Sequence, residues 1–301
     1  MIKILFLLLN ATILLSQMKN HTMNVSNVEL NKLSGVKILD AKELEFKSLN
    51  GVDVKELSAL AYKDNVLYAL GDKGVLFHFY IQVQNKRIKK LSLLKALRLK
   101  NEDGTVLKKS HRDSEGLSFI ENNLLISFEK KPRVHQYSIL GVKIKKQKIH
   151  KDLQIIKKYR SKNKALEAVA YNKEYGVVTA PEKSLVNLDK KLHTLYSKTK
   201  KWIFPALGSI SGLEFMGKHK IMILQRKQNK LTRSRVTILS SLNLKNSNYK
   251  VLAKLDSVDG WNIDNFEGLT RIDKDTYLII SDDNNSFFQK TLLVLFEVIK
   301  N

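Results

Sequence analysis

One pattern of small, acidic, apolar and aromatic positions recurs five times along the chain. In each copy a small or acidic residue precedes Leu or Val, and an apolar β-rich run ending in a charged residue follows. The anchor positions of the five copies are Leu60, Leu117, Val169, Leu213 and Leu269. These anchors lie 57, 52, 44 and 56 residues apart, and each charged strand end follows its anchor by 12 or 13 positions. A period of about fifty residues built of short strands is typical of a β-propeller.

The repeat predicts an all-β fold, a β-propeller of five blades, with six blades as the main alternative. One blade of four short strands cannot bury both of its faces, whereas blades that stand side by side in a ring can. The first strand of each unit would lie nearest the axis, where glycine at 116, 212 and 268 relieves crowding. Strand-like segments at Val36 to Phe46 and Thr291 to Lys300 are expected to pair and close the ring. An open sandwich of the same strands is the other arrangement considered.

The N-terminus combines a short positive start with an apolar run. Lys3 precedes a mostly apolar stretch from Ile4 to Leu15, which has the order and length of a secretory signal peptide. We therefore expect a signal peptide over residues 1–16, a flexible lead-in over 17–34, and one domain over 35–301. The run is short for a membrane span, and an uncleaved anchor is the alternative. A periplasmic or secreted protein follows from this interpretation.

The chain is strongly basic, with 53 Lys and Arg against 29 Asp and Glu and a net charge of +24. Lysine-rich strand faces fit a solvated outer surface, and they also fit attraction of phosphoesters, acidic lipids or polysaccharide. A nucleic-acid partner is not expected, because arginine is scarce and the basic residues are spread over every repeat. Cysteine is absent, which excludes disulfides and cysteine-ligated metals. We expect a monomer with no transmembrane domain after signal cleavage.

Equivalent positions in a ring of blades converge at one end of its channel. The acidic residues that precede three of the anchors are Glu115, Glu167 and Glu267. These three are the candidate catalytic carboxylates, as acid, base or metal ligand. The alternative is a structural role, in which such carboxylates accept backbone N–H bonds and join neighbouring blades. No nucleophile elbow, phosphate-binding glycine loop or His-Glu-x-x-His motif occurs, so an enzyme and a binding protein both remain open.

The charged strand ends add metal and anion candidates to this set. Oxygen ligands suit a hard cation such as Ca²⁺, and the candidate metal ligands are Glu129, Glu182, Asp282 and Asp283. Guanidinium and ammonium groups beside them suit an anionic or ester substrate. The candidate substrate-binding residues are Lys130, Arg133, Arg226 and Lys290.

Four ordered pairs of segments carry a family resemblance. In each pair a first segment is followed along the chain by a second. The pairs are Asp113–Leu117 with Ile126–Val134, Asn163–Ala170 with Thr179–Glu182, Ile210–Leu213 with Leu224–Arg226, and Asp264–Leu269 with Ser281–Asn284. As a set they resemble the phytase-like domain family, described as having esterase-like activity of phytase, over residues 50 to 301. The resemblance implies a secreted or periplasmic β-propeller with hydrolytic activity. The link to calcium-dependent propeller phytases is an analogy of fold.

The chain departs from the family pattern at two strand positions. Ala165-Leu166-Glu167 stands where Gly-Phe-Glu is usual and keeps the acid, whereas Gln225-Arg226 replaces Glu-Arg and loses a carboxylate. The leading hypothesis is an exported propeller that hydrolyses an ester or phosphoester with carboxylates near the central channel, with or without a divalent cation. The alternative is a non-catalytic propeller that binds an anionic small molecule, an envelope glycan or a protein.

Overall fold

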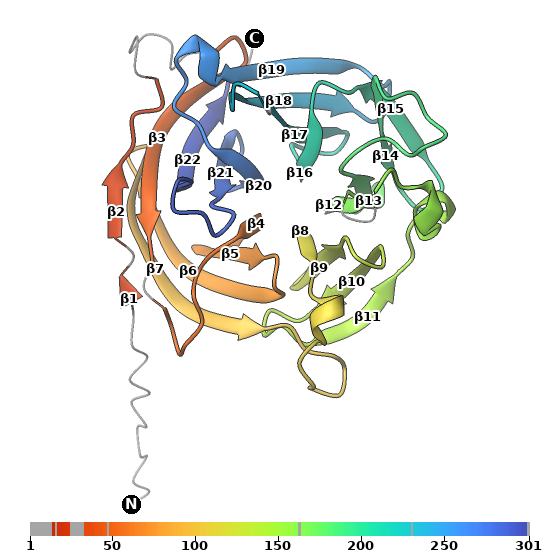
Figure 1. The fold of residues 1–301 in the computed structure, drawn as a ribbon, viewed down its shortest axis with the longest axis horizontal. Coiled ribbons are helices and arrows are strands. Elements are labelled where there is room, and N and C mark those ends of the chain that lie inside the picture. The colour runs from red at the N-terminus through yellow and green to blue at the C-terminus, as the bar shows by residue number, and fades with distance from the viewer. Residues whose placement is uncertain are drawn as a thin grey trace, which may run out of the picture.

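The computed structural model describes residues 14–15, 17–24, 33–46, 48–161, 164–229 and 231–299. Their strands form five antiparallel sheets that stand around a central axis (Figure 1). The predicted five-bladed β-propeller is therefore confirmed, and the six-bladed ring and the open sandwich are wrong. In the described part of the chain, no helix has both the length and the apolar character needed to cross a bilayer.

Each blade contains four consecutive antiparallel strands, numbered outward from the axis, except that the fifth blade takes its outer strand from the N-terminal side. Blade 1 contains β4 (Leu57–Lys63), β5 (Val66–Gly71), β6 (Val75–Gln84) and β7 (Arg87–Arg98). Blade 2 contains β8 (Ser114–Ile120), β9 (Asn123–Phe128), β10 (Arg133–Tyr137) and β11 (Lys143–Gln147). Blade 3 contains β12 (Leu166–Asn172), β13 (Gly176–Pro181), β14 (Leu192–Tyr196) and β15 (Lys201–Pro205). Blade 4 contains β16 (Ser209–Phe215), β17 (Lys220–Gln228), β18 (Arg235–Asn243) and β19 (Tyr249–Asp256). Blade 5 contains β20 (Asn265–Arg271), β21 (Thr276–Asp282), β22 (Thr291–Val298) and β3 (Val36–Glu45).

The ring closes through blade 5, because β3 pairs antiparallel with β22 and places Ala41 opposite Val294. The predicted pairing of the two terminal segments is confirmed. Strand β2 (Gln17–Asn20), within the predicted lead-in, adds to the outer edge of β3, and β1 (Leu14–Leu15) pairs with β7. Residues 1–13 and 16 of the predicted signal peptide, and residues 25–32 of the lead-in, lie outside the described residues.

The innermost strands β4, β8, β12, β16 and β20 surround the axis and contact one another around the ring (Figure 1). Crowding there explains the predicted glycines. A Cβ on Gly116 would lie 2.7 Å from the carbonyl oxygen of Glu167 and 2.8 Å from the amide nitrogen of Val169, both in the next blade. Side-chain atoms cannot approach backbone this closely, so only glycine fits at this position.

The core lies between the blades rather than inside any one of them. Buried Leu70 and Leu76 of blade 1, for example, share an apolar cluster with Leu117 and Ile126 of blade 2. The five anchors Leu60, Leu117, Val169, Leu213 and Leu269 are all buried. They line a remnant of the channel of only about 10 Å³, and thus form an apolar plug across the axis.

Alternating strand directions put two kinds of connection at the same end of the ring: the loops from second to third strands and the connections between blades. Hydrogen bonds join them, as from the Lys290 amide to Asp264 Oδ2 and from the Arg235 amide to Ser257 Oγ. We call this end of the ring the loop face. The turns within the first and last strand pairs of each blade lie at the opposite end.

Candidate functional site

A β-bulge interrupts the pairing of the innermost strand at the same place in all five blades. The register shifts at one extra residue, and these residues are Ser58, Glu115, Glu167, Ser211 and Glu267. A bulge changes the direction in which a side chain points. Carboxylate oxygens of Glu115, Glu167 and Glu267 lie within 4.8 Å of one another, although they come from three different blades. The predicted convergence of these three residues near the axis is therefore observed, and we call these five positions the bulge ring.

A second ring comes from the charged residues at the ends of the second strands. Its members are Asp72, Glu129, Glu182, Arg226 and Asp282. Oxygens of Glu129 and Glu182 lie within 4.8 Å of one another and of Glu167 in the bulge ring. Asp113, which precedes β8, forms a similar group with Glu115 and Glu129. The two rings thus bring seven carboxylates together on the loop-face side of the apolar plug.

Arg226 is the cation at the centre of this carboxylate cluster. Its guanidinium lies 2.8 Å from Glu267 Oε1 and 3.6 Å from Glu167 Oε1, and it donates to Asn265 Oδ1 at 2.8 Å. Asn265 Nδ2 in turn donates to Glu267 Oε1 at 2.8 Å. The buried Nε of Arg226 has no hydrogen-bond partner among the described residues. Because this nitrogen is buried, a ligand would contact Arg226 only through the exposed part of its side chain, which is 28% of the whole.

The environment of the cluster favours the protonated forms of several carboxyl groups. Burial, and then the charges of Asp72 and Glu167, raise the pKa of Glu115 well above its usual value. Burial, and then Glu267 and Asp282, raise the pKa of Asp72 to about 9. Burial also raises the pKa of Glu129 and of Asp282 to about 7 in each case. The cause is physical: like charges lie close together above an apolar plug, where solvation of the ionised form is poor.

The same cluster fits a hard divalent cation. It offers only oxygen donors, and its three overlapping carboxylate groups each bring ligand atoms within 4.8 Å of one another. Its acids outnumber the three cations that contact them in the described residues, which are Lys130, Lys164 and Arg226. Calcium prefers such oxygen ligands and would relieve the repulsion among them. Of the predicted metal ligands, Glu129 and Glu182 belong to these groups. Asp283 instead accepts the backbone N–H of Glu56 and of Asn285.

Three of the predicted anion-binding residues are engaged elsewhere. The Arg133 guanidinium donates to the carbonyl oxygens of His111 and of two neighbouring loop residues, and it lies 3.9 Å from the centre of the Phe128 ring. Lys130 pairs with Asp113 at 3.0 Å, and Lys290 pairs with Glu43 at 2.6 Å. Of that set, Arg226 alone contacts bulge-ring carboxylates among the described residues, namely Glu167 and Glu267, whereas Lys130 reaches only Asp113 of the overlapping groups.

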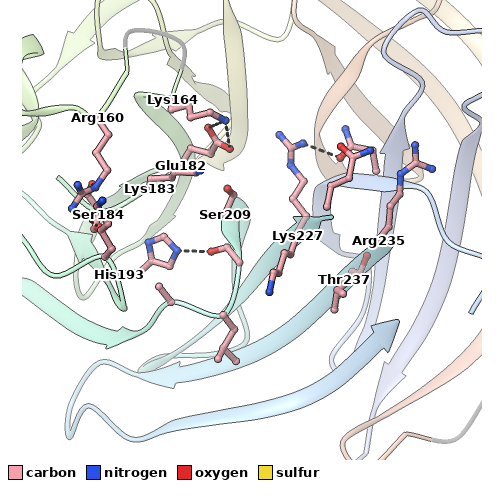
Figure 2. Close-up of a pocket in the computed structure, with 18 of the residues that line it drawn as sticks. Arg160, Lys164, Glu182, Lys183, Ser184, His193, Ser209, Lys227, Arg235 and Thr237 are labelled. Atoms are coloured by element: carbon pink, nitrogen blue, oxygen red, sulfur yellow. Dashed lines mark hydrogen bonds and ion pairs between the residues drawn. The ribbon is translucent and has the colours of Figure 1, made fainter. Parts of the chain in front are cut away.

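A cavity of about 750 Å³ opens beside the cluster on the loop face, between blades 3 and 4 and the start of blade 5 (Figure 2). Glu182, Arg226 and Asn265 belong both to its lining and to the carboxylate cluster. Seven basic residues line it, against the two acids Glu182 and Asp264; they are Arg160, Lys164, Lys183, Lys190, Arg226, Lys227 and Arg235. The cavity is therefore a strongly cationic space that leads to the acidic centre.

The cations of the cavity divide into two groups by their partners. Arg160 donates to the carbonyl oxygens of Ser184, Leu185 and Leu188 and so holds the loop between β13 and β14. Arg235 pairs with Asp264 at 2.7 Å, and Lys164 pairs with Glu182 at 3.2 Å. In contrast, the ammonium groups of Lys183, Lys190 and Lys227 form no hydrogen bond or ion pair with the described part of the chain. These three are the cations that remain for an anionic ligand.

His193 is a further cavity residue that the sequence did not single out. Its Nε2 lies 2.6 Å from the carbonyl oxygen of Gly208 and donates to it, while the buried Nδ1 has no partner among the described residues. Burial lowers the pKa of His193, so the ring is neutral and Nδ1 is an acceptor. Lys183 and Lys227 were visible in the sequence as neighbours of the strand ends. Arg160, Lys190, His193 and Arg235 were not, because they lie far from any repeated position.

A family model described as "Phytase-like: Esterase-like activity of phytase" matches residues 52–285. The match covers well over half of the chain, and both rings of charged residues fall within it. The protein belongs to this phytase-like family. Comparison with curated proteins gave no match.

Solved structures of low sequence identity resemble the chain over most of its length. The crystal structure of Myxococcus xanthus glutaminyl cyclase is 9% identical, with 89% of this chain and 99% of that chain covered, at a TM-score of 0.49. The structure of U3-55K is also 9% identical, with 87% and 98% covered, at a TM-score of 0.43. At these values neither likeness bears on the function of this chain.

Proposed function

We propose that the protein is a hydrolase of an anionic ester or phosphoester, with the reaction at the axial carboxylates. One observation carries this proposal: three of the five equivalent bulges bring Glu115, Glu167 and Glu267 together beside Arg226 and a cationic cavity. A purely structural cluster would not need an open, charged approach. The apolar plug closes the axis on the other side, so substrate would enter from the loop face.

Two carboxyl groups of the cluster, Glu267 and Glu115, suit opposite roles in proton transfer. Burial raises the pKa of Glu267, but Arg226 at 2.8 Å and the hydrogen bond from Asn265 partly offset this rise, and no such offset acts on Glu115; Glu267 is therefore the group that would accept a proton from the attacking water. Glu115 forms no hydrogen bond or ion pair within the described chain, and its raised pKa makes it the proton donor to the leaving oxygen. Arg226, with Lys183 and Lys227 in the same cavity, would hold the negative charge of the substrate.

Calcium is the cation that the carboxylate cluster would hold, with Glu129, Glu167 and Glu182 as ligands, which leaves Glu115 and Glu267 for proton transfer. When bound, such a cation polarises an ester or phosphoryl oxygen. The protein's own groups would still orient the substrate and move the protons.

The alternative is a propeller that binds an anionic ligand without turnover. One contact favours it: Glu129 Oε1 accepts the backbone N–H of Ala165 at 3.0 Å and so joins blades 2 and 3, which is a structural role for a carboxylate. A binding protein would use the same cavity and the same free cations.

The test is a panel of chromogenic carboxylic esters and phosphate monoesters, assayed with calcium and with a chelator. We expect hydrolysis by the wild-type protein and a loss of about a hundredfold or more in Glu115→Gln, because the proton donor is removed while the side-chain volume is kept. Glu174→Gln is the matched control, since Glu174 is an exposed carboxylate in the β12–β13 turn at the opposite end of the ring.

Two results would contradict the proposal. One is the absence of turnover on every substrate, together with tight binding of the same anionic compounds, which would favour the binding protein. The other is a Glu115→Gln variant that folds and hydrolyses the substrates as well as Glu174→Gln does.

We also infer that the protein is exported to the periplasm or secreted. The support is the order of Lys3 and the apolar run from Ile4 to Leu15. A substrate of this enzyme would then be an extracytoplasmic compound.

A further inference from the structure

The loop face carries a set of exposed apolar side chains on several separate loops. Phe287 and Phe288, in the loop between β21 and β22, are 98% and 90% exposed, and Leu231, between β17 and β18, is 95% exposed. Val258, between blades 4 and 5, is 74% exposed, and Val186, between β13 and β14, is 51% exposed. The two phenylalanine rings contact each other edge to face, with centroids 5.8 Å apart. We call these five residues the apolar tips.

The location of the tips is selective. They come from four separate connections of blades 3, 4 and 5, and all four connections belong to the loop face. Among the described residues outside the loop face, the most exposed large hydrophobic side chains are Ile203 in the outer strand β15, at 55%, and Leu140 in the turn between β10 and β11 at the opposite end, at 54%. Isolated exposed hydrophobic residues are ordinary, whereas a set gathered on one functional face marks a contact surface.

Cations adjoin two of the tips along the chain. Lys183, Lys190 and Lys191 flank Val186, while Lys227 and Arg233 flank Leu231. None of these five side chains forms a hydrogen bond or ion pair with the described residues. Asp189 and Asp259 are exposed acids of the same connections, and the free cations outnumber them. The contact surface is therefore apolar at its tips and positive beside two of them.

We propose that the loop face docks on a bilayer that contains anionic lipid. Apolar tips on separate loops can enter the boundary of the acyl chains while the lysines and arginine beside them stay at the headgroups. The net charge of +24 adds long-range attraction to a negative surface. A protein partner would need its own matching sites for four spaced loops, whereas a fluid bilayer accepts them at any spacing.

Docking in this orientation turns the mouth of the cationic cavity toward the membrane surface, because the cavity and the tips share the loop face. The inference goes beyond the proposed hydrolysis and does not depend on it, since a non-catalytic propeller would dock by the same residues.

The absence of cysteine allows a local test on the full chain. Phe288→Cys and the control Leu140→Cys each carry one environment-sensitive fluorophore, and each is mixed with vesicles of phosphatidylcholine alone or of phosphatidylcholine with phosphatidylglycerol. We expect a blue shift and a rise in emission at position 288 only with the anionic vesicles, and no change at position 140. This readout is local, so it is insensitive to any binding by the apolar N-terminal segment.

Two further variants separate the apolar and ionic contributions in the labelled Phe288→Cys background. Phe287→Ser should raise the lipid concentration needed for the half-maximal shift by about tenfold. Lys191→Gln with Arg233→Gln should do the same at low salt, whereas Lys245→Gln with Lys274→Gln, exposed lysines at the opposite end of the ring, should have no effect. Melting temperatures confirm that each variant is folded.

The proposal is overturned if position 288 gives no shift with anionic vesicles, or if position 140 shifts equally. It is also overturned if phosphatidylcholine alone produces the full shift, or if the Phe287→Ser variant titrates like its parent. Binding of an acidic protein without any vesicle response would assign the surface to a protein partner instead.

Discussion

Glu267 is the bulge-ring carboxylate that forms the shorter ion pair with Arg226. Its Oε1 accepts from both Arg226 and Asn265 at 2.8 Å, and its backbone lies in the bulge of β20. A glutamine at this position keeps the volume and one acceptor oxygen. It loses the negative charge that holds the guanidinium and, in the proposed mechanism, accepts the proton.

We therefore expect Glu267→Gln to lower turnover or ligand affinity far more than it lowers the melting temperature. Both quantities should be measured on the same preparation, with Glu174→Gln as the control for a loss of one carboxylate charge. The reverse pattern, a lower melting temperature with unchanged turnover per folded molecule, would make Glu267 a structural residue and remove it from the site.

Arg133 illustrates what residue-level reasoning from sequence could not predict. The sequence places this cation four residues after the charged strand end Glu129, but it does not show which carbonyl oxygens face the guanidinium. In the fold, three backbone carbonyls and the Phe128 ring surround the Arg133 guanidinium. Arg226 is embedded in its strand instead, so its position in the repeat alone was enough to place it near the axis.

At the scale of the strands, the repeat predicted more than its individual residues did. The five anchors, the following apolar runs and the pairing of the terminal segments are all present in the structure. The bulges were not predicted, because a bulge is a property of how two strands pair and leaves no mark in the hydrophobic alternation of one strand. The cavity was not predicted either, since connections of unequal length and composition form its walls.

The closing strand gives a prediction at this scale. In β22 the residues Leu292 to Phe296 are all buried, and β3 has no other partner on that edge. Removing several such side chains costs about 2–5 kcal/mol each, which together exceeds the stability of an ordinary domain of about 5–15 kcal/mol. Deleting residues 291–301 should therefore unfold all five blades together.

Thermal melting followed by circular dichroism measures this directly. A deletion of residues 17–20, which removes only the added edge strand β2, is the control and should leave a cooperative transition. A truncated protein without β22 that melts like the full chain would show that the ring does not need this closure.

At the scale of the whole molecule, the basic residues that give the net charge of +24 lie in two kinds of environment. Many lysines lie on outer strands, such as the mostly exposed Lys143–Gln147 strand β11, and fit a solvated surface. Others line the cavity or adjoin the apolar tips and have no hydrogen-bond or ion-pair partner among the described residues. Composition alone could not separate these groups, because the face on which a loop emerges depends on the direction of each strand.

The proposed export is also a property of the whole chain. We expect the mature protein to begin between residues 16 and 24 and to leave the cytosol, because a charged start followed by an apolar run is the pattern of a cleaved signal. N-terminal sequencing of protein from fractionated native cells tests this. Intact Met1 in the cytosolic fraction would refute it.

The shared fifth blade also sets an order of events during synthesis. Strand β3 is made before any complete blade, and its partner β22 is made after the other four blades are finished. Until β22 is made, one long edge of β3 has no partner strand, and the ring of five blades cannot close. A translocation channel that accepts only unfolded polypeptide would meet the chain during this interval. The late pairing of β22 with β3 would therefore delay folding until export can begin.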